Sequence, residues 1–149
     1  MEKMIVIGAS GFLGTAVTNL ASESYQVLAT YKERTCPFTS SNTENVRLDF
    51  GTEATVKELE NIVGNLDTVI VASNIEYVQQ NELTTRNYQS FLRNLVVRNI
   101  KTVFISTDAV FDGRETVYTE ESAPNPTTEY GRRKLESERL IGVGNNVVI

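Results

Sequence analysis

The sequence predicts an α/β protein built on a doubly wound parallel sheet. Short apolar segments rich in β-branched residues alternate with longer segments that carry apolar residues on one side at helical spacing. The short segments are apolar at successive positions, which is typical of strands that helices cover on both faces. A length of 149 residues fits one domain. We therefore expect a single domain over residues 1–149 with strands and helices in alternation.

The predicted elements follow one another in regular order. The expected strands are residues 4–7, 25–31, 46–50, 67–72, 101–106 and 146–149. The expected helices are residues 12–21, 53–63, 79–99 and 126–141. The last helix has Asn125 as a plausible cap and Pro126 in its first turn. We expect the last strand near the middle of the sheet, with further chain after it.

The first helix is expected to bury one apolar side, formed by Phe12, Leu13, Ala16, Val17, Leu20 and Ala21. Polar stretches at residues 32–45 and 108–125 contain Pro, Ser, Thr and Asn, and are expected to be loops.

Composition excludes several kinds of chemistry. The chain has no histidine, which removes Ser-His-Asp and Cys-His catalysis and most zinc sites, and its one cysteine, Cys36, excludes an internal disulfide. A net charge of −5 with scattered basic residues argues against nucleic-acid binding. No apolar run approaches the roughly 18 residues needed to cross a bilayer, and the N-terminus resembles no signal peptide. The default expectation is a cytoplasmic protein without membrane contact.

A glycine-rich turn, GASGFLG, joins the first strand to the first helix. One glycine permits the tight turn, a second lets the backbone approach a pyrophosphate, and a third lets the helix pack closely on the strand. The helix N-terminus adds amide donors and positive potential. A purely structural turn is the alternative, but the strand–turn–helix context favours dinucleotide binding. The cofactor-binding residues expected in this turn are Gly8, Ser10, Gly11, Phe12, Leu13 and Gly14.

The end of the second strand bears on the choice of cofactor. An acidic residue here would hydrogen-bond the adenosine ribose and favour NAD. This chain has Tyr31, Lys32 and Arg34 here, all three expected to bind the cofactor, and the two cations can neutralise a 2′-phosphate. Glu33 argues the other way. We expect NADP, with NAD as the alternative.

Tyr130 and Lys134 lie four positions apart near the start of the last predicted helix, so they share a helix face. A phenol has a pKa near ~10, too high for an efficient proton relay at neutral pH. A fixed ammonium favours the phenolate and lowers that value. The strand that ends near Ser106 should meet this helix at the carboxyl edge of the sheet, where such folds bind ligands.

Together these motifs resemble the extended short-chain dehydrogenase/reductases, a family with an NAD(P)-binding Rossmann fold. The resemblance rests on the glycine turn, on STDAVFDG at residues 106–113 and on YGRRK at residues 130–134. The longer segment YTEESAPNPTTEYGRRKLESE is most similar to the dTDP-4-dehydrorhamnose reductase branch. The resemblance to the family covers essentially the whole chain.

This resemblance implies roles for individual residues. Tyr130 would give a proton to the substrate carbonyl, Lys134 would hold the nicotinamide ribose and tune the tyrosine, and Thr107 would hydrogen-bond the reacting oxygen. Hydride would come from the nicotinamide, so no metal site is expected. Further cofactor contacts are implied at Asp49 and Phe50 near the adenine, and at Ala72, Ser73 and Asn87.

One position favours reduction over dehydration. The related sugar-nucleotide dehydratases carry Thr-Asp-Glu at this strand end, because elimination of water needs an additional base. Here the third residue is Ala109. The segment at residues 71–75 also departs from the Asn-Ala-Ala pattern of the family.

Three hypotheses follow. The first is the cofactor half of an NADPH-dependent reductase of a 4-keto-6-deoxy sugar nucleotide, which needs a C-terminal substrate domain that this sequence does not contain. The second is a non-catalytic NADP-binding partner, resembling the regulatory subunit of methionine adenosyltransferase. The third is a truncated chain without activity. Apolar surface where the C-terminal region would dock is expected to favour a homodimer.

Overall fold

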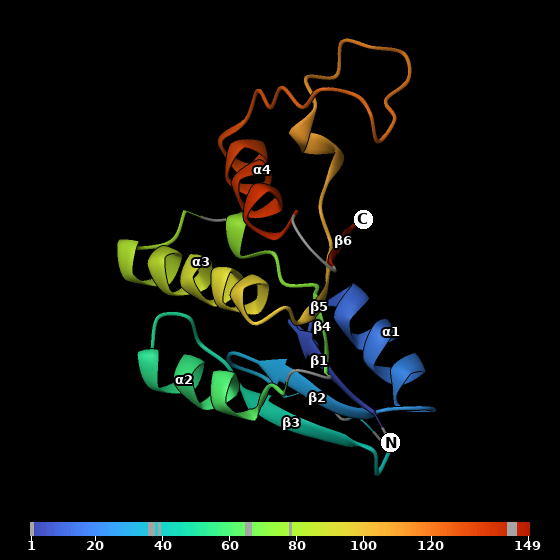
Figure 1. Ribbon diagram of the computed structural model, residues 1–149, viewed down its shortest axis with the longest axis vertical. Helices are drawn as coiled ribbons and strands as arrows, with labels where there is room; N and C mark the ends of the chain where they lie inside the picture. The colour runs from blue at the N-terminus through green and yellow to red at the C-terminus, as the bar shows by residue number, and fades with distance from the viewer. Residues whose placement is uncertain (1, 36–37, 39, 65–66, 78, 143–145) are drawn as a thin grey trace.

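Six parallel strands form one sheet in the order β3-β2-β1-β4-β5-β6 (Figure 1). The computed structural model describes residues 2–149 except 36, 37, 39, 65, 66, 78 and 143–145, so Cys36 lies outside the described residues. The strands are β1 (Lys3–Ile7), β2 (Gln26–Tyr31), β3 (Thr43–Arg47), β4 (Thr68–Val71), β5 (Lys101–Phe104) and β6 (Asn146–Val148). This topology confirms the predicted doubly wound parallel sheet.

Helices cover both faces of the sheet. Helix α1 (Phe12–Ala21) lies on one face, and α2 (Glu53–Ile62) and α3 (Glu82–Val97) lie on the other (Figure 1). Helix α4 (Glu129–Ile141) packs against α3. Two short 3₁₀ turns, η1 (Ile75–Tyr77) after β4 and η2 (Asp108–Val110) after β5, lie at the carboxyl edge of the sheet.

The central strand explains why the predicted strands read as continuous apolar runs. β1 pairs with β2 on one side and with β4 on the other. Ile5 and Ile7 belong to the core cluster shared with α2 and α3, whereas Val6 belongs to the cluster shared with α1. Successive side chains point to opposite faces, so a strand covered twice needs an apolar residue at every position.

The third strand begins and ends three residues earlier than predicted. Residues 46–50 were expected, but the strand is Thr43–Arg47, and its first residues are polar because it is an edge strand with one exposed side. Leu48 and Phe50 are buried in the core after the strand has ended. These two apolar residues therefore contact the core although they lie after β3.

The last strand was expected near the middle of the sheet, and this was wrong for the described residues. β6 lies at the edge beside β5, with Phe104 opposite Val148. Ile149 N donates to Phe104 O at 2.9 Å and extends the pairing. The connection from β5 to β6 passes through η2 and α4 and adds the next strand directly beside the previous one.

Two predicted helices begin later than expected. α3 begins at Glu82, where Asn81 Oδ1 accepts from Thr84 N at 2.8 Å. α4 begins at Glu129, where Thr128 Oγ1 accepts from Gly131 N at 3.0 Å. The predicted cap, Asn125, instead donates its side-chain amide to Asp112 Oδ2 at 2.9 Å. Each true cap is the residue whose side chain meets the first free amides of the helix.

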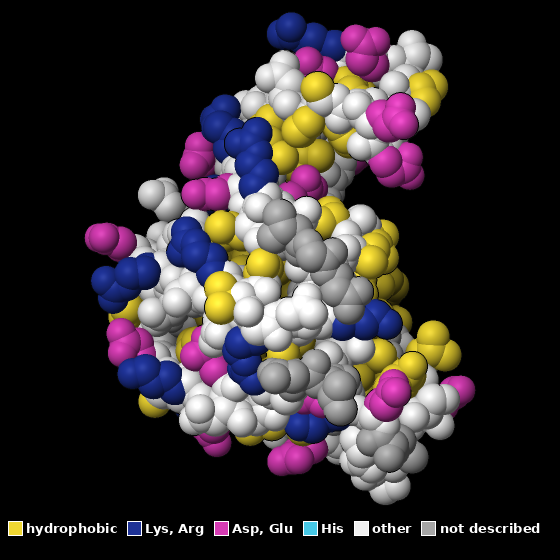
Figure 2. Space-filling view, in the orientation of Figure 1, with side chains coloured by type: hydrophobic (Ala, Val, Ile, Leu, Met, Phe, Trp, Pro, Cys, Tyr) yellow, Lys and Arg dark blue, Asp and Glu magenta, His cyan; other side chains and the backbone are white. Residues whose placement is uncertain are grey.

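The buried side of α1 also differs from the prediction. Phe12 is 99% exposed and Leu20 is 70% exposed, whereas Gly14, Thr18 and Ala21 are buried. Figure 2 shows hydrophobic side chains on the surface over α1. At Gly14 the helix lies so close to the end of β1 that no Cβ would fit, and Phe12 and Leu20 project to solvent while Val17 packs against the core.

Candidate nucleotide-binding site

The glycine turn is tightly folded around the carbonyl of Gly8. Gly8 has φ +83°, a left-handed conformation that favours glycine, and a Cβ there would lie 2.8 Å from Ser73 Cα. A Cβ at Gly14 would lie 2.1 Å from Gly8 O. Gly11 N donates to Gly8 O at 3.0 Å and closes the turn. Gly8 is therefore required by its left-handed conformation and by the approach of Ser73, and Gly14 by the close approach of the helix to the end of β1.

The start of α1 is open to a ligand. Gly11 is its N-cap and no side chain caps the helix, so the first amides have no partner within the helix. The first two residues of the helix, Phe12 and Leu13, are both exposed to solvent. An uncapped helix N-terminus attracts anions such as a pyrophosphate.

A cleft of about 180 Å³ opens beside the glycine turn. Seven of the predicted cofactor residues line this cleft: Gly8, Ser10, Tyr31, Lys32, Asp49, Phe50 and Ser73. Gln80 and Thr84 line it too, and neither was predicted from the sequence. They come from the segment before α3 and from its first turn, and nothing in their local pattern indicates a ligand.

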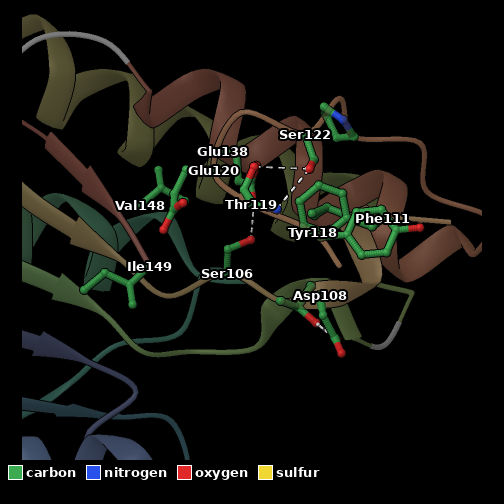
Figure 3. A pocket seen from close by; sticks show the side chains of 13 residues that line it. Ser106, Asp108, Phe111, Tyr118, Thr119, Glu120, Ser122, Glu138, Val148 and Ile149 are labelled. Atoms are coloured by element: carbon green, nitrogen blue, oxygen red, sulfur yellow. Dashed lines mark hydrogen bonds between the residues drawn. The ribbon is translucent and has the colours of Figure 1, made fainter. Parts of the chain in front are cut away.

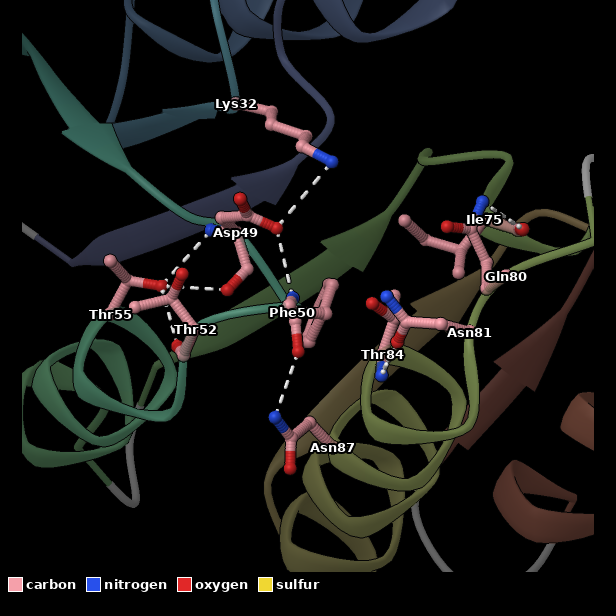
Figure 4. A network of polar contacts seen from close by, with 11 residues as sticks. Lys32, Asp49, Phe50, Thr52, Thr55, Ile75, Gln80, Asn81, Thr84 and Asn87 are labelled. Atoms are coloured by element: carbon pink, nitrogen blue, oxygen red, sulfur yellow. Dashed lines mark hydrogen bonds and ion pairs between the residues drawn. The ribbon is translucent and has the colours of Figure 1, made fainter.

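Asp49 organises one wall of this cleft. Its Oδ1 accepts from Gly51 N at 2.9 Å and pairs with Lys32 Nζ at 3.6 Å (Figure 4). Asn87 donates its side-chain amide to Phe50 O at 2.8 Å, so it supports the wall from behind and is absent from its lining (Figure 4). This ion pair therefore links Lys32, which follows β2, to Asp49, which follows β3.

A second cleft, of about 510 Å³, adjoins the first and shares Ser10 and Lys32 with it. Glu33, Arg34 and Thr35 complete its lining. Two cations and one carboxylate therefore surround a polar hollow next to the glycine turn. A phosphate group could be held here by Lys32 and Arg34.

α4, which carries Tyr130, packs directly on η2, which follows Thr107, although Tyr130 is absent from the lining of the cleft that Thr107 lines. A Cβ at Gly131 would lie 2.1 Å from Ala109 O, so the glycine of YGRRK permits this close approach. Thr107 Oγ1 accepts from Ala109 N at 3.3 Å and holds the turn. The Tyr130 ring is half-buried and packs edge-to-face on Tyr77 of η1, with ring centres 5.5 Å apart.

Thr107 also lines a wide cleft of about 520 Å³ at the end of β5. Its walls include Phe111 stacked on Tyr118, with ring centres 4.5 Å apart (Figure 3). Ser106 Oγ donates to Glu138 Oε1 on the opposite wall (Figure 3). Figure 2 shows the molecule hollowed between the projecting loop and the body of the domain.

Lys134 points into the protein interior. Its side chain is 3% exposed, its Nζ pairs with Glu76 Oε2 at 3.3 Å, and the ammonium lies 4.6 Å from the centre of the Phe104 ring. Glu76 was missed by the sequence analysis, although it stands beside the segment that departs from the family pattern. Ala72, the remaining predicted cofactor residue, is half-buried directly after β4.

The Glu76 carboxylate accepts hydrogen bonds from two further donors. Tyr88 Oη and Ser137 Oγ each donate to Glu76 Oε1 at 2.8 Å. Burial raises the pKa of Tyr88 well above its usual value, and the Glu76 carboxylate raises it further. The carboxylate thus joins η1 to α3 and α4 in the interior of the domain.

The described residues give two findings on metals and membranes. They contain no group of three His, Cys, Asp or Glu residues able to hold a metal ion. In the same residues, every helix is too short or too polar to span a bilayer.

A parallel sheet of this order, with a glycine turn at the carboxyl end of β1, defines a Rossmann-like domain of the short-chain dehydrogenase/reductase type. The family described as "RmlD substrate binding domain" matches residues 1–149. The chain therefore belongs to that family, which confirms the resemblance drawn from its motifs.

The relatives are of two kinds. Methionine adenosyltransferase 2 subunit beta of Xenopus laevis is 29% identical over 150 residues, covering 94% of this chain and 42% of the relative. The same subunit of Danio rerio is 59% identical over 39 residues, which cover 26% of this chain and 12% of the relative. dTDP-4-dehydrorhamnose reductase of Aggregatibacter actinomycetemcomitans is 26% identical over 144 residues, covering 95% of this chain and 47% of the enzyme.

Solved structures give the same fold. A hypothetical dTDP-4-dehydrorhamnose reductase from Sulfolobus tokodaii superposes with a TM-score of 0.77 at 27% identity, covering 99% of this chain and 54% of the other. MoeE5 in complex with UDP-glucose and NAD has a TM-score of 0.73 at 25% identity, covering 99% of this chain and 52% of the other. The chain thus spans about half the length of these proteins.

Proposed function

We propose that this chain binds NADPH and is the cofactor-binding half of a reductase that acts on a 4-keto-6-deoxy sugar nucleotide. The observation that carries the proposal is the arrangement around the glycine turn. Seven predicted cofactor residues line one cleft, and Lys32 and Arg34 line the cleft beside it.

The residues present fit a dinucleotide. The uncapped start of α1 offers backbone amides for the pyrophosphate, and Asp49 and Phe50 border the cleft that would hold the adenosine. The hollow at Lys32 and Arg34 suits a 2′-phosphate better than an unmodified ribose, since both side chains are cations. Relatives of this fold also bind NAD, so NAD is the competing cofactor.

The chemistry proposed for the opposite end of the crevice is reduction of a carbonyl. The bound nicotinamide supplies the hydride. Thr107 would hydrogen-bond the carbonyl oxygen and Tyr130 would donate the proton to it, and the packing of α4 on η2 supports this assignment. The sugar nucleotide is the substrate class of the reductase relatives, and a C-terminal domain would complete its pocket.

Binding is tested by titrating the chain with NADPH and with NADH while nicotinamide fluorescence is followed. We expect binding of both, with NADPH bound more tightly. A folded chain that binds neither nucleotide would remove the proposal. Turnover is then assayed with a dTDP-4-keto-6-deoxy sugar, with Tyr130→Phe as the matched variant, because this change removes only the phenolic hydroxyl.

A second function is favoured by one specific observation. Lys134 is paired with the buried Glu76 inside the domain, and the chain also resembles methionine adenosyltransferase 2 subunit beta. A non-catalytic NADP-binding partner subunit would need the cofactor clefts but no activated tyrosine. It predicts NADPH binding without turnover, together with co-purification of a methionine adenosyltransferase catalytic subunit.

A further inference from the structure

The cleft of about 180 Å³ beside the glycine turn has room for one part of a dinucleotide. Pockets that enclose a whole drug-sized ligand begin at roughly 300 Å³, so a single ring system of the cofactor fits here. The apolar part of the lining suits the two faces of a planar base and consists of Ile7, Leu48, Phe50 and Ile75. Under the proposed function, that base is the adenine of the cofactor.

Most polar side chains in this lining do not distinguish an amino group from a carbonyl on the edge of a base. Five of them carry hydroxyls, which rotate to donate or to accept: Ser10, Thr30, Tyr31, Ser73 and Thr84. The Asp49 carboxylate only accepts, but its Oδ1 is already engaged by Gly51 N and by Lys32 Nζ. A group that reads the base must therefore be a free acceptor or a free donor of fixed kind.

Gln80 supplies an acceptor of fixed kind. The residue is half-buried, and its Nε2 donates to Ile75 O at 3.3 Å. Turning the amide over would bring two carbonyl oxygens together, so this contact determines which end of the amide is the oxygen. No described residue donates to Gln80 Oε1. Figure 4 shows Ile75 and Gln80 on one side of the view, with Asp49 and Phe50 on the other.

We propose that Gln80 is a specificity-determining residue whose Oε1 accepts a hydrogen bond from the 6-amino group of the cofactor adenine. Adenine carries a donor at this position, whereas hypoxanthine carries a carbonyl, which only accepts. Glutamine recognises adenine through the same amino group in protein–DNA complexes. The inference rests on the proposed function for the presence of a dinucleotide, and it adds the side chain that reads the base.

The test compares NADPH with deamino-NADPH, in which hypoxanthine replaces adenine and the fluorescent nicotinamide is unchanged. Titration of the unmodified chain with each gives two dissociation constants. We expect NADPH to bind roughly tenfold more tightly, because the acceptor of Gln80 would face a carbonyl in deamino-NADPH and both would stay unpaired. Gln80→Met removes the amide at similar length and should reduce this preference to about twofold. Gln79→Met changes an exposed neighbour outside the lining and should keep the full preference.

Gln80→Glu separates the hydrogen bond from the shape of the side chain. It keeps an acceptor and removes the amino group, so the preference for NADPH should persist, even though the added charge weakens the binding of both nucleotides. Loss of the preference in Gln80→Glu as well as in Gln80→Met would show that Gln80 only shapes the cleft, and would overturn the proposal. The readout is a ratio of two affinities within one variant, so a general weakening of the fold does not imitate the expected result.

The remaining outcomes distinguish this inference from the proposed function. Equal affinities of the unmodified chain for NADPH and deamino-NADPH would overturn the inference and leave the proposed function standing. A full preference in folded Gln80→Met would also overturn it, and would assign the reading of the base to Asp49. A folded, unmodified chain that binds neither nucleotide would remove the proposed function, and this inference with it.

Discussion

Gly14 lies against Gly8 so closely that a Cβ at Gly14 would sit 2.1 Å from the Gly8 carbonyl oxygen. We expect Gly14→Ala to push α1 away from β1 and to lower the free energy of unfolding by about 1–3 kcal/mol, the usual cost of overpacking. Chemical denaturation measures this loss. NADPH binding should weaken in the same variant, because the amides of the turn move with the helix.

Gly11 provides the matched control. A Cβ there would lie 3.3 Å from Gly8 O, and the residue has φ −79°, which any amino acid adopts. Gly11→Ala should therefore change the free energy of unfolding much less than Gly14→Ala. Equal losses at the two positions would contradict the role assigned to the contact between Gly8 and Gly14.

Arg34 and Lys32 should decide the preference for NADPH over NADH. Arg34→Ala removes a cation from the hollow beside the glycine turn, and we expect NADPH affinity to fall by roughly tenfold or more, since a hydrogen bond to a charged group contributes about 1.5–3 kcal/mol. NADH affinity should change little. Lys32→Ala should act on both nucleotides, because Lys32 also pairs with Asp49 in the adjoining cleft.

Glu33→Gln is the control for that comparison, because it changes a charge in the same hollow without removing a cation. It should leave NADPH affinity equal or slightly higher. Parallel losses of NADPH and NADH in Arg34→Ala would show that Arg34 supports the fold of the loop and does not read the 2′-phosphate.

The features predicted correctly are those that the local sequence determines. The glycine turn is recognisable because Gly8 and Gly14 satisfy steric needs of the turn itself. The order of strands and helices follows from apolar periodicity, and the parallel sheet follows from strands that are apolar on both faces. Seven of the residues that line the cleft beside the glycine turn were therefore predictable once these elements were placed.

The features predicted wrongly depend on contacts between distant segments. Leu48 and Phe50 are apolar because the core needs them, but they lie beyond the end of β3. Phe12 and Leu20 were expected on the buried side of α1, but that side is formed by Gly14, Thr18 and Ala21, which follow the tertiary contact at Gly14. Glu76 approaches Lys134 across 58 positions of sequence, and no local pattern indicates such a pair.

Tyr88 is expected to stabilise the fold through its hydroxyl. Tyr88→Phe removes one of the donors to the buried Glu76 carboxylate and should lower the free energy of unfolding by about 1–3 kcal/mol. Tyr25→Phe, on the smaller core cluster, is the control and should have a lesser effect. An unaltered unfolding midpoint in Tyr88→Phe would show that the hydrogen bond contributes nothing net.

The same residue gives an alkaline dependence. Burial raises the pKa of Tyr88 above its value in the unfolded chain, near ~10. Its contribution to stability is therefore fully present below pH ~10 and is lost as the pH rises further, because the unfolded chain releases that proton first. The free energy of unfolding, measured by denaturation at a series of alkaline pH values, should therefore fall less steeply with pH for Tyr88→Phe than for the unmodified chain.

Asp112 is expected to hold the loop that forms one wall of the wide cleft. Hydrogen bonds from the Tyr118 hydroxyl, the Arg114 amide and the Asn125 side chain lower the pKa of Asp112 to about 2. Since this value lies below that of the unfolded chain, near ~3.9, the stabilisation is present above pH ~4 and is lost as the pH falls toward about 2. The protection of the Arg114 amide, which is its exchange rate compared with that of an unstructured peptide at the same pH, should fall over that interval. In the Asp112→Asn variant the Arg114 amide should exchange rapidly at every pH. In the Asp108→Asn variant the same amide should exchange as it does in the unmodified chain. Equal protection of the amide in the chain with and without Asp112 would mean that the stacking of Phe111 on Tyr118 alone orders the loop.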